Sequence, residues 1–228
     1  MRKILCLFLP IVIIVLLCSC SNYSEETLLK RYERDPSIKN AYNLFAYYCE
    51  DYYNDNPDYY KIAEYGDVLF VEKVNEIDSI TFSMQGYEES PESSLDNYLN
   101  YYIISIAKVC DRDVFRNRCI SVFELFSDSG ALAVAYEESI DSYYEKTGDI
   151  SLCIDLYDTL IEKSSENIIR KKFLAENKVS FLEFNKVDES LIEKAKQELS
   201  VIDKEFQTEM DKAKEKGYGP KEFIEQFE

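Results

Sequence analysis

Histidine and tryptophan are both absent from this chain of 228 residues. Without histidine the chain lacks the commonest general base near neutral pH, which excludes Ser-His-Asp and Cys-His catalysis and zinc sites built from histidine. The 44 acidic residues leave carboxylate chemistry open. A glycosidase, however, needs two carboxyl groups facing each other across a cleft, and no pair stands out in the sequence. We therefore predict no enzymatic activity, no catalytic residue, no cofactor and no metal site.

Long apolar runs are absent beyond the N-terminus. The single run, Ile4 to Leu17, follows Arg2 and Lys3 and is interrupted by Pro10. It has about fourteen residues, whereas a helix needs roughly twenty to cross a bilayer. A basic start and a short apolar run followed by small residues are typical of a secretory signal.

The end of this run, Leu17-Cys18-Ser19-Cys20, resembles the lipobox of bacterial lipoproteins. The resemblance implies that residues 1–19 are removed and that Cys20 carries a diacylglyceryl group and acyl chains such as palmitate. Two or more chains hold a protein stably on a membrane. Cys18 fits less well because the bulky Leu17 precedes it directly. The alternatives are an ordinary signal peptide with incidental cysteines and a retained signal anchor.

Basic residues are too few to balance the acidic ones, and the formal net charge is −18. Residues 1–19 contain two basic and no acidic residues, so their removal leaves 209 residues with 24 basic and 44 acidic side chains, a charge of −20. Such a surface repels phosphate backbones, which argues against nucleic acid as a partner. It also repels anionic headgroups, so the lipid at Cys20 is the predicted membrane contact.

Cysteine is present in the body of the chain only at Cys49, Cys110, Cys119 and Cys153. In an exported protein an even number of cysteines is compatible with disulfides. Each of these residues, however, lies in or beside an apolar helical stripe, where cysteine behaves as a small hydrophobic residue. Buried thiols are therefore the preferred interpretation. A bridge between Cys110 and Cys119 stays open as the alternative.

Apolar residues recur with helical period throughout the mature chain, which predicts an all-α fold of about nine helices. Ile77 to Met84 has some strand-like content but no partner strand nearby, so we predict a helix end and a loop there. The clearest stripes are Leu95, Tyr98, Leu99, Tyr102, Ile103 and Ile106; Leu132, Tyr136, Ile140, Tyr143 and Tyr144; Leu152, Cys153, Leu156, Tyr157, Leu160 and Ile161; and Leu191, Ala195, Leu199, Ile202, Phe206, Met210 and Ala213.

Helix boundaries are predicted from proline, glycine and aspartate. Four prolines follow residues suited to the N-cap and are predicted to occupy the first helical position. Residues 20–34 are predicted to be the lipidated cysteine and a tether, residues 83–94 a flexible loop, and residues 35–228 the helical domain. The prolines are Pro36, Pro57, Pro91 and Pro220, and further breaks are expected at Asp113, Gly130, Gly148 and Asp188.

Residues 134–167 resemble one tetratricopeptide repeat, with the 34-residue helix–turn–helix length of that family. A looser copy lies at residues 43–76, and residues 95–128 and 167–200 have hairpin form without the signature. Glu137, Asp141 and Ser165 depart from the family pattern, which has tryptophan, a small residue and proline at these places. The matching positions are Ile140, Tyr144, Gly148-Asp149, Cys153, Tyr157 and Leu160.

This resemblance implies antiparallel helical hairpins stacked as a short solenoid, because one hairpin cannot bury its apolar face alone. An irregular helical bundle is the alternative. Tetratricopeptide-like stacks bind peptides or partner proteins, so the expected function is that of a non-enzymatic docking module, lipid-anchored to a bacterial membrane in the cell envelope. The alternative is an accessory lipoprotein that delivers a solute or ligand to a transporter. Tyrosines could line a binding groove or pack the core, so no ligand-binding residue is predicted.

Overall fold

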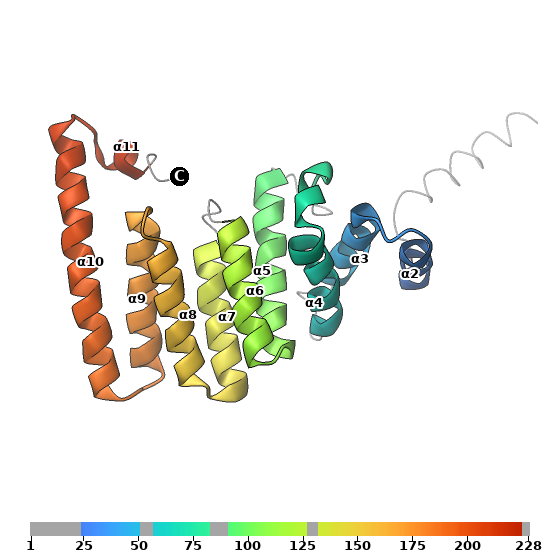
Figure 1. Cartoon of the computed structure of the whole chain (residues 1–228), viewed down its shortest axis with the longest axis horizontal. Coiled ribbons are helices and arrows are strands. Elements are labelled where there is room, and N and C mark those ends of the chain that lie inside the picture. The colour runs from blue at the N-terminus through green and yellow to red at the C-terminus, as the bar shows by residue number, and fades with distance from the viewer. Residues whose placement is uncertain (1–23, 51–56, 83–90, 127–131, 225–228) are drawn as a thin grey trace, which may run out of the picture.

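The computed structural model describes residues 24–50, 57–82, 91–126 and 132–224. Over these residues every regular element is a helix and no strand is present, which confirms the predicted all-α class. The helices lie side by side in a row that follows the order of the chain, from α2 at one end to α10 at the other (Figure 1). They pack mainly on neighbours one or two places away along the chain.

Helix bounds divide the described residues into three parts. The first contains α2 (Glu25–Arg34), α3 (Ile38–Glu50) and α4 (Tyr59–Asp67), which continues into a π-helical segment (Val68–Glu72) and a 3-10 segment (Val74–Ser79). The second contains α5 (Pro91–Val109), α6 (Arg112–Leu125), α7 (Leu132–Thr147) and α8 (Ile150–Lys163). The third contains α9 (Ile168–Phe184), α10 (Glu189–Glu215) and α11 (Pro220–Ile224).

Short polar turns begin and end these helices. Five of the described helices start at a side chain that accepts a hydrogen bond from an otherwise free backbone N–H, a contact that contributes about 1 kcal/mol. Gly148 has a φ of 67° and ends α7 in the left-handed conformation that favours glycine. The capping residues are Asp58, Asp111, Asp149, Asn167 and Asp188.

Two of the four predictions from proline are correct, since Pro91 and Pro220 are the first residues of α5 and α11. Pro36 and Pro57 were assigned wrongly, because each precedes its helix by two residues. The capping residue stands between the proline and the helix, as Asp58 does before α4.

The predicted tether is wrong for its last ten residues, which form α2. Leu28 of this helix is buried, and Glu25 accepts a hydrogen bond of 2.7 Å from Tyr48 of α3. Asp113 does not mark a break, since it lies in the first turn of α6 after the cap at Asp111. The predicted loop at residues 83–94 is shorter at its C-terminal end, where α5 begins. Residues 83–90 and Gly130 lie outside the described residues.

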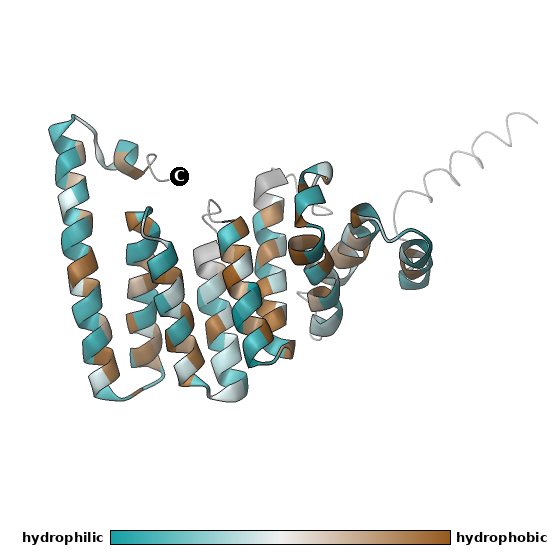
Figure 2. Ribbon diagram, in the orientation of Figure 1, coloured by the Kyte–Doolittle hydropathy of each residue, from teal (hydrophilic) through white to brown (hydrophobic). Residues whose placement is uncertain are grey.

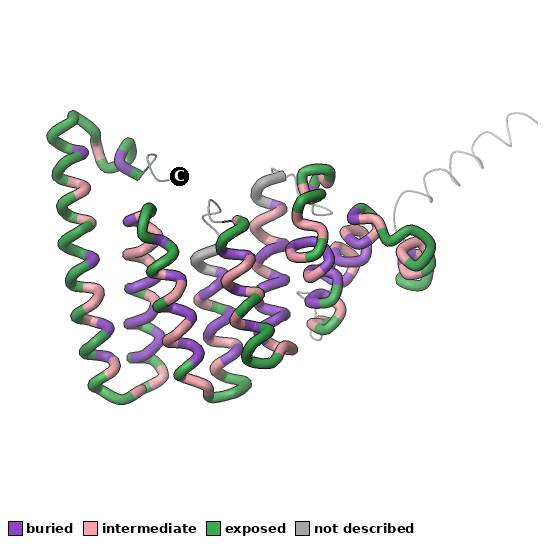
Figure 3. The backbone as a smooth tube through the Cα atoms, viewed as in Figure 1, coloured by how far each residue is buried: buried purple, intermediate pink, exposed green. Residues whose placement is uncertain are grey.

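The main core runs through the row of helices, and tyrosine is a large part of it (Figure 3). A second, smaller cluster joins α9, α10 and α11, where the rings of Phe206 and Phe223 lie 5.6 Å apart. Helix α10 is mostly polar and exposed, with its apolar residues confined to one narrow stripe (Figure 2). Tyrosine thus serves mainly for packing, and the buried tyrosines are Tyr48, Tyr65, Tyr98, Tyr101, Tyr102, Tyr136, Tyr143 and Tyr157.

Helices α4 and α5 approach closely at Gly66. A Cβ atom at this position would lie 2.2 Å from the ring of Tyr102, so only glycine fits there without movement. The Tyr102 hydroxyl donates to Asp67, which also accepts a bond of 3.0 Å from Arg118 of α6. One carboxylate therefore fixes α4, α5 and α6 relative to one another.

Candidate binding surface

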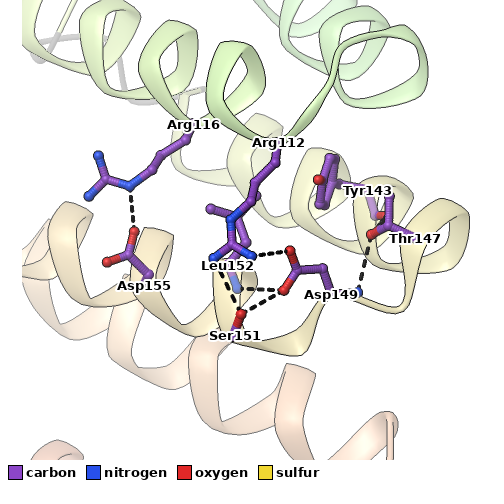
Figure 4. A network of polar contacts seen from close by, with 8 residues as sticks. All are labelled: Arg112, Arg116, Tyr143, Thr147, Asp149, Ser151, Leu152 and Asp155. Atoms are coloured by element: carbon purple, nitrogen blue, oxygen red, sulfur yellow. Dashed lines mark hydrogen bonds and ion pairs between the residues drawn. The ribbon is translucent and has the colours of Figure 1, made fainter.

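Helices α6 and α8 meet along a seam that is closed by polar contacts (Figure 4). Arg112 donates to Asp149 at 2.8 Å, and Arg116 donates to Asp155 at 2.5 Å. Lys163, at the far end of α8, pairs with Glu124 of α6. The three pairs span the length of the seam and set how the two helices lie together.

Asp149 has two tasks in this seam. Its carboxylate caps α8 by accepting the Leu152 N–H at 3.1 Å, and it also accepts the Ser151 hydroxyl at 2.7 Å. The hydrogen bond from Ser151 holds the pKa of Asp149 below its ordinary value, helped by the Leu152 N–H and by Arg112. The ionised form is therefore the stable one in the folded protein.

A different arrangement occurs on the other side of α8. Lys178 of α9 is buried, and its ammonium group donates to Asp158 of α8 at 2.5 Å and to Glu198 of α10 at 2.6 Å. Burial alone lowers the pKa of a lysine, but the hydrogen bonds to both carboxylates outweigh this and raise the pKa of Lys178. Lys178 therefore stays charged and holds α8 and α10 on either side of α9.

Above this lysine lies an open pocket of about 340 Å³ between α8 and α10, which we call the α8–α10 pocket. Small side chains on α9 and α10 leave this space. Its apolar lining is Ile161, Ala175, Ala195, Val201 and Ile202, and its charged lining is Asp158, Glu162, Lys171, Lys178, Glu198 and Glu205.

A larger pocket of about 640 Å³ lies at the other end of the row, beside Phe82 and Phe126. These residues are the last described positions before residues 83–90 and 127–131. The α8–α10 pocket is instead bounded by helices that are described along their whole length, so it is the better defined candidate.

Helix α7 carries carboxylates on the face turned away from α8. Glu137 accepts a bond of 3.1 Å from Asn177 of α9, and Glu145 lies 4.0 Å from Lys108 of α5. Asp141 lies between them at helical spacing of four residues. Burial raises the pKa of Asp141, and repulsion from Glu137 and Glu145 raises it further. This face presents acidic groups that the protein only partly compensates.

The body cysteines offer no reactive thiol. All four are free; Cys49, Cys119 and Cys153 are buried, and Cys110 is half-buried. Burial raises the pKa of Cys153 to about 12 and the pKa of the other three thiols above their ordinary value. A reactive cysteine needs a lowered pKa, so these thiols belong to the packing.

The predicted lipidation site, Cys20, lies outside the described residues. Among the residues that are described, no group of three or more acidic or cysteine side chains is placed to hold a metal ion. In the same part of the chain, no helix combines the length and apolar character that a membrane span requires.

Sequence reasoning missed Lys178 and the pocket beside it. Lys178 stands midway between Leu174 and Leu182 in an otherwise apolar stripe, so a lysine at a core position was the available signal. Its partners lie 20 residues away in either direction, and a local pattern does not reach them. Comparison with known proteins adds no assignment, since no family model, curated protein or solved structure matches the chain.

Proposed function

We propose that this protein is a lipid-anchored envelope lipoprotein whose helical domain is a short tetratricopeptide-like stack that docks a protein or peptide. The proposal for the anchor rests on Leu17-Cys18-Ser19-Cys20 and the short apolar run before it. The proposal for the domain rests on the order of the helices, since successive antiparallel pairs pack side by side and each leaves polar and apolar side chains along an extended surface.

The single observation that most favours docking is the α8–α10 pocket. It is open to solvent, has an apolar floor, and lies between helices that fixed ion pairs hold apart. An open pocket suits a side chain of a partner, whereas delivery of a solute would need an enclosed cavity. The pocket therefore supports the docking module over the delivery of a solute.

The anchor is tested by Cys20→Ala in the full chain. We expect the variant to lose the lipid and to move from the membrane fraction to the soluble fraction of the native cell. Cys18→Ala is the matched control and should stay in the membrane fraction. A Cys20→Ala variant that stays membrane-bound and uncleaved would contradict the lipoprotein assignment.

Docking is tested with the full chain as bait in the native cell after chemical cross-linking. We expect one protein to be enriched, and a peptide from the cross-linked segment of that protein to compete it away. Enrichment that the peptide leaves unchanged would contradict peptide docking. A small molecule released on denaturing the purified protein, without any cross-linked partner, would favour the delivery of a solute.

A further inference from the structure

The α8–α10 pocket combines an exposed apolar surface with a particular placement of charge. Val201 is 54% exposed and lies in the pocket with Ile161 and Ile202. Ala175 and Ala195 are buried and too short to fill the space above them. A pocket of about 340 Å³ is at the small end of the range for binding sites, and it fits one large side chain.

The carboxylates of the pocket lie outermost. The side chains of Asp158, Glu198 and Glu205 are 47%, 40% and 47% exposed, whereas those of Lys171 and Lys178 are only 21% and 5% exposed. The ammonium groups are therefore covered by the carboxylates with which they pair. Glu162, also at the rim, is exposed and adds a further negative charge.

This placement decides the charge of the occupant. The six charged lining residues comprise four carboxylates and two ammonium groups, so the rim is negative by two charges. A phosphate or carboxylate ligand would meet carboxylates first and be repelled. A lysine or arginine would keep its aliphatic stem on the apolar floor and its cationic head among the exposed carboxylates.

We propose that the α8–α10 pocket takes an apolar side chain of a partner segment in which lysine or arginine flanks that side chain. The proposal rests on the proposed docking function and specifies the chemistry of the partner. The apolar side chain contacts Ile161, Val201 and Ile202, and the flanking cations face Glu162 and Glu205. Specificity comes from the charge of the rim, and affinity from the apolar surface that is removed from water.

The test places a photo-activated cross-linking residue at Glu162 in the full chain in the native cell. Matched positions are Val114 on α6 and Phe184 on α9, which are 39% and 83% exposed and lie outside the pocket. We expect a product at position 162 whose cross-linked segment contains an apolar residue next to lysine or arginine. An acidic or uncharged segment at this position would overturn the proposal.

A second variant shows that the pocket itself is responsible. Val201→Lys, combined with the cross-linker at position 162, places a cation in the site and should reduce the yield at least fivefold. Val114→Lys makes the same change at an exposed valine elsewhere and should leave the yield within twofold. Equal yields from the two variants would overturn the proposal. Circular dichroism of both variants checks that the helices are retained.

The outcomes separate this proposal from the docking function on which it rests. A product at position 114 or 184 but none at 162 would leave the docking function standing and overturn the pocket as its site. The absence of a product at all three positions would overturn both.

Discussion

Helix α8 has a different kind of neighbour on each side. It packs directly on α6, and the seam is crossed by exposed or half-exposed ion pairs such as Arg116 with Asp155. Towards α10 it is separated by α9, and the connection passes through the buried ammonium group of Lys178. The first seam is closed, and the second contains a pocket.

The comparison shows that ion pairs have two structural roles in this protein. In the α6–α8 seam the helices already touch, so the pairs fix orientation and each contributes little free energy. In the second seam a long lysine side chain fills the space under the pocket and keeps its charge among two carboxylates. Its removal would leave those carboxylates facing each other without a cation.

Lys178→Met gives the largest expected effect. Loss of a partner from a fully buried pair costs about 3–5 kcal/mol, and since Asp158 and Glu198 remain partly hydrated we expect about 2–3 kcal/mol. Lys172→Met is the matched control on the same helix, where the lysine also pairs with two carboxylates but is 25% exposed, and it should cost less than about 1 kcal/mol. Urea unfolding measures both, and equal losses would remove the distinction between the seams.

Asp149→Ala should cost about 1–2 kcal/mol, because it removes the cap of α8 and the contact with Arg112 together. Asp149→Asn keeps a capping oxygen and should cost less. The pKa of Asp149 in the folded protein lies below the ordinary 3.8, so the carboxylate stabilises the protein above that pH, and this is lost as the pH falls through the folded value. Urea unfolding at pH 7 and pH 3 should therefore show the difference between wild type and Asp149→Asn shrinking in acid; a constant difference would contradict it.

Arg116→Ala should cost about 0.5–1 kcal/mol at low salt, since its pair with Asp155 is partly exposed. In 1 M salt the screening length falls to about 3 Å and the cost should decrease. The Lys178→Met loss should change much less with salt because that group is buried. If salt reduces the two losses alike, the difference in burial has no energetic consequence.

Asp141→Asn has the smallest effect and the opposite sign. Replacing a carboxylate that lies four residues from Glu137 and from Glu145 should stabilise the protein by about 0.5–1 kcal/mol at pH 7. Because the pKa of Asp141 is raised in the folded protein, its acid form stabilises the fold below the ordinary 3.8, and this is lost as the pH rises through the folded pKa. The gain should therefore vanish in acid, as thermal unfolding at pH 3 and pH 7 can measure. Glu124→Gln, which removes a paired carboxylate, should destabilise at pH 7.

Much of the fold was accessible from local pattern. The stripe from Leu191 to Ala213 predicted α10 because only one face of that helix is covered, and Gly148 marked a turn because the backbone there is left-handed. Pro36 and Pro57 misled because the same residue type suits the position before a cap as well as the first helical position. The α2 helix was missed since a charged segment with one buried leucine has little periodicity to detect.

The candidate site was not accessible in this way, because its contacts join different helices. The cross-helix pairs recur at a spacing close to the length of one hairpin, with Arg112 and Asp149 37 residues apart and Arg116 and Asp155 39 apart. A search for opposite charges at that spacing would have indicated the α6–α8 seam. The pocket depends on Ala175 and Ala195, whose small size is an ordinary choice in any helix.

The neighbour-to-neighbour packing of the helices has a consequence for how the chain acquires its structure. Since each helix contacts partners close to it in sequence, few contacts must wait for distant parts of the chain, and folding should be rapid. Early hairpins can assemble while later ones are still being synthesised. Tension applied at residue 24 would reach α2 first, and since α2 packs on α3, it would peel helices away from that end in sequence. The pocket near the opposite end would keep its shape until most of the row had opened.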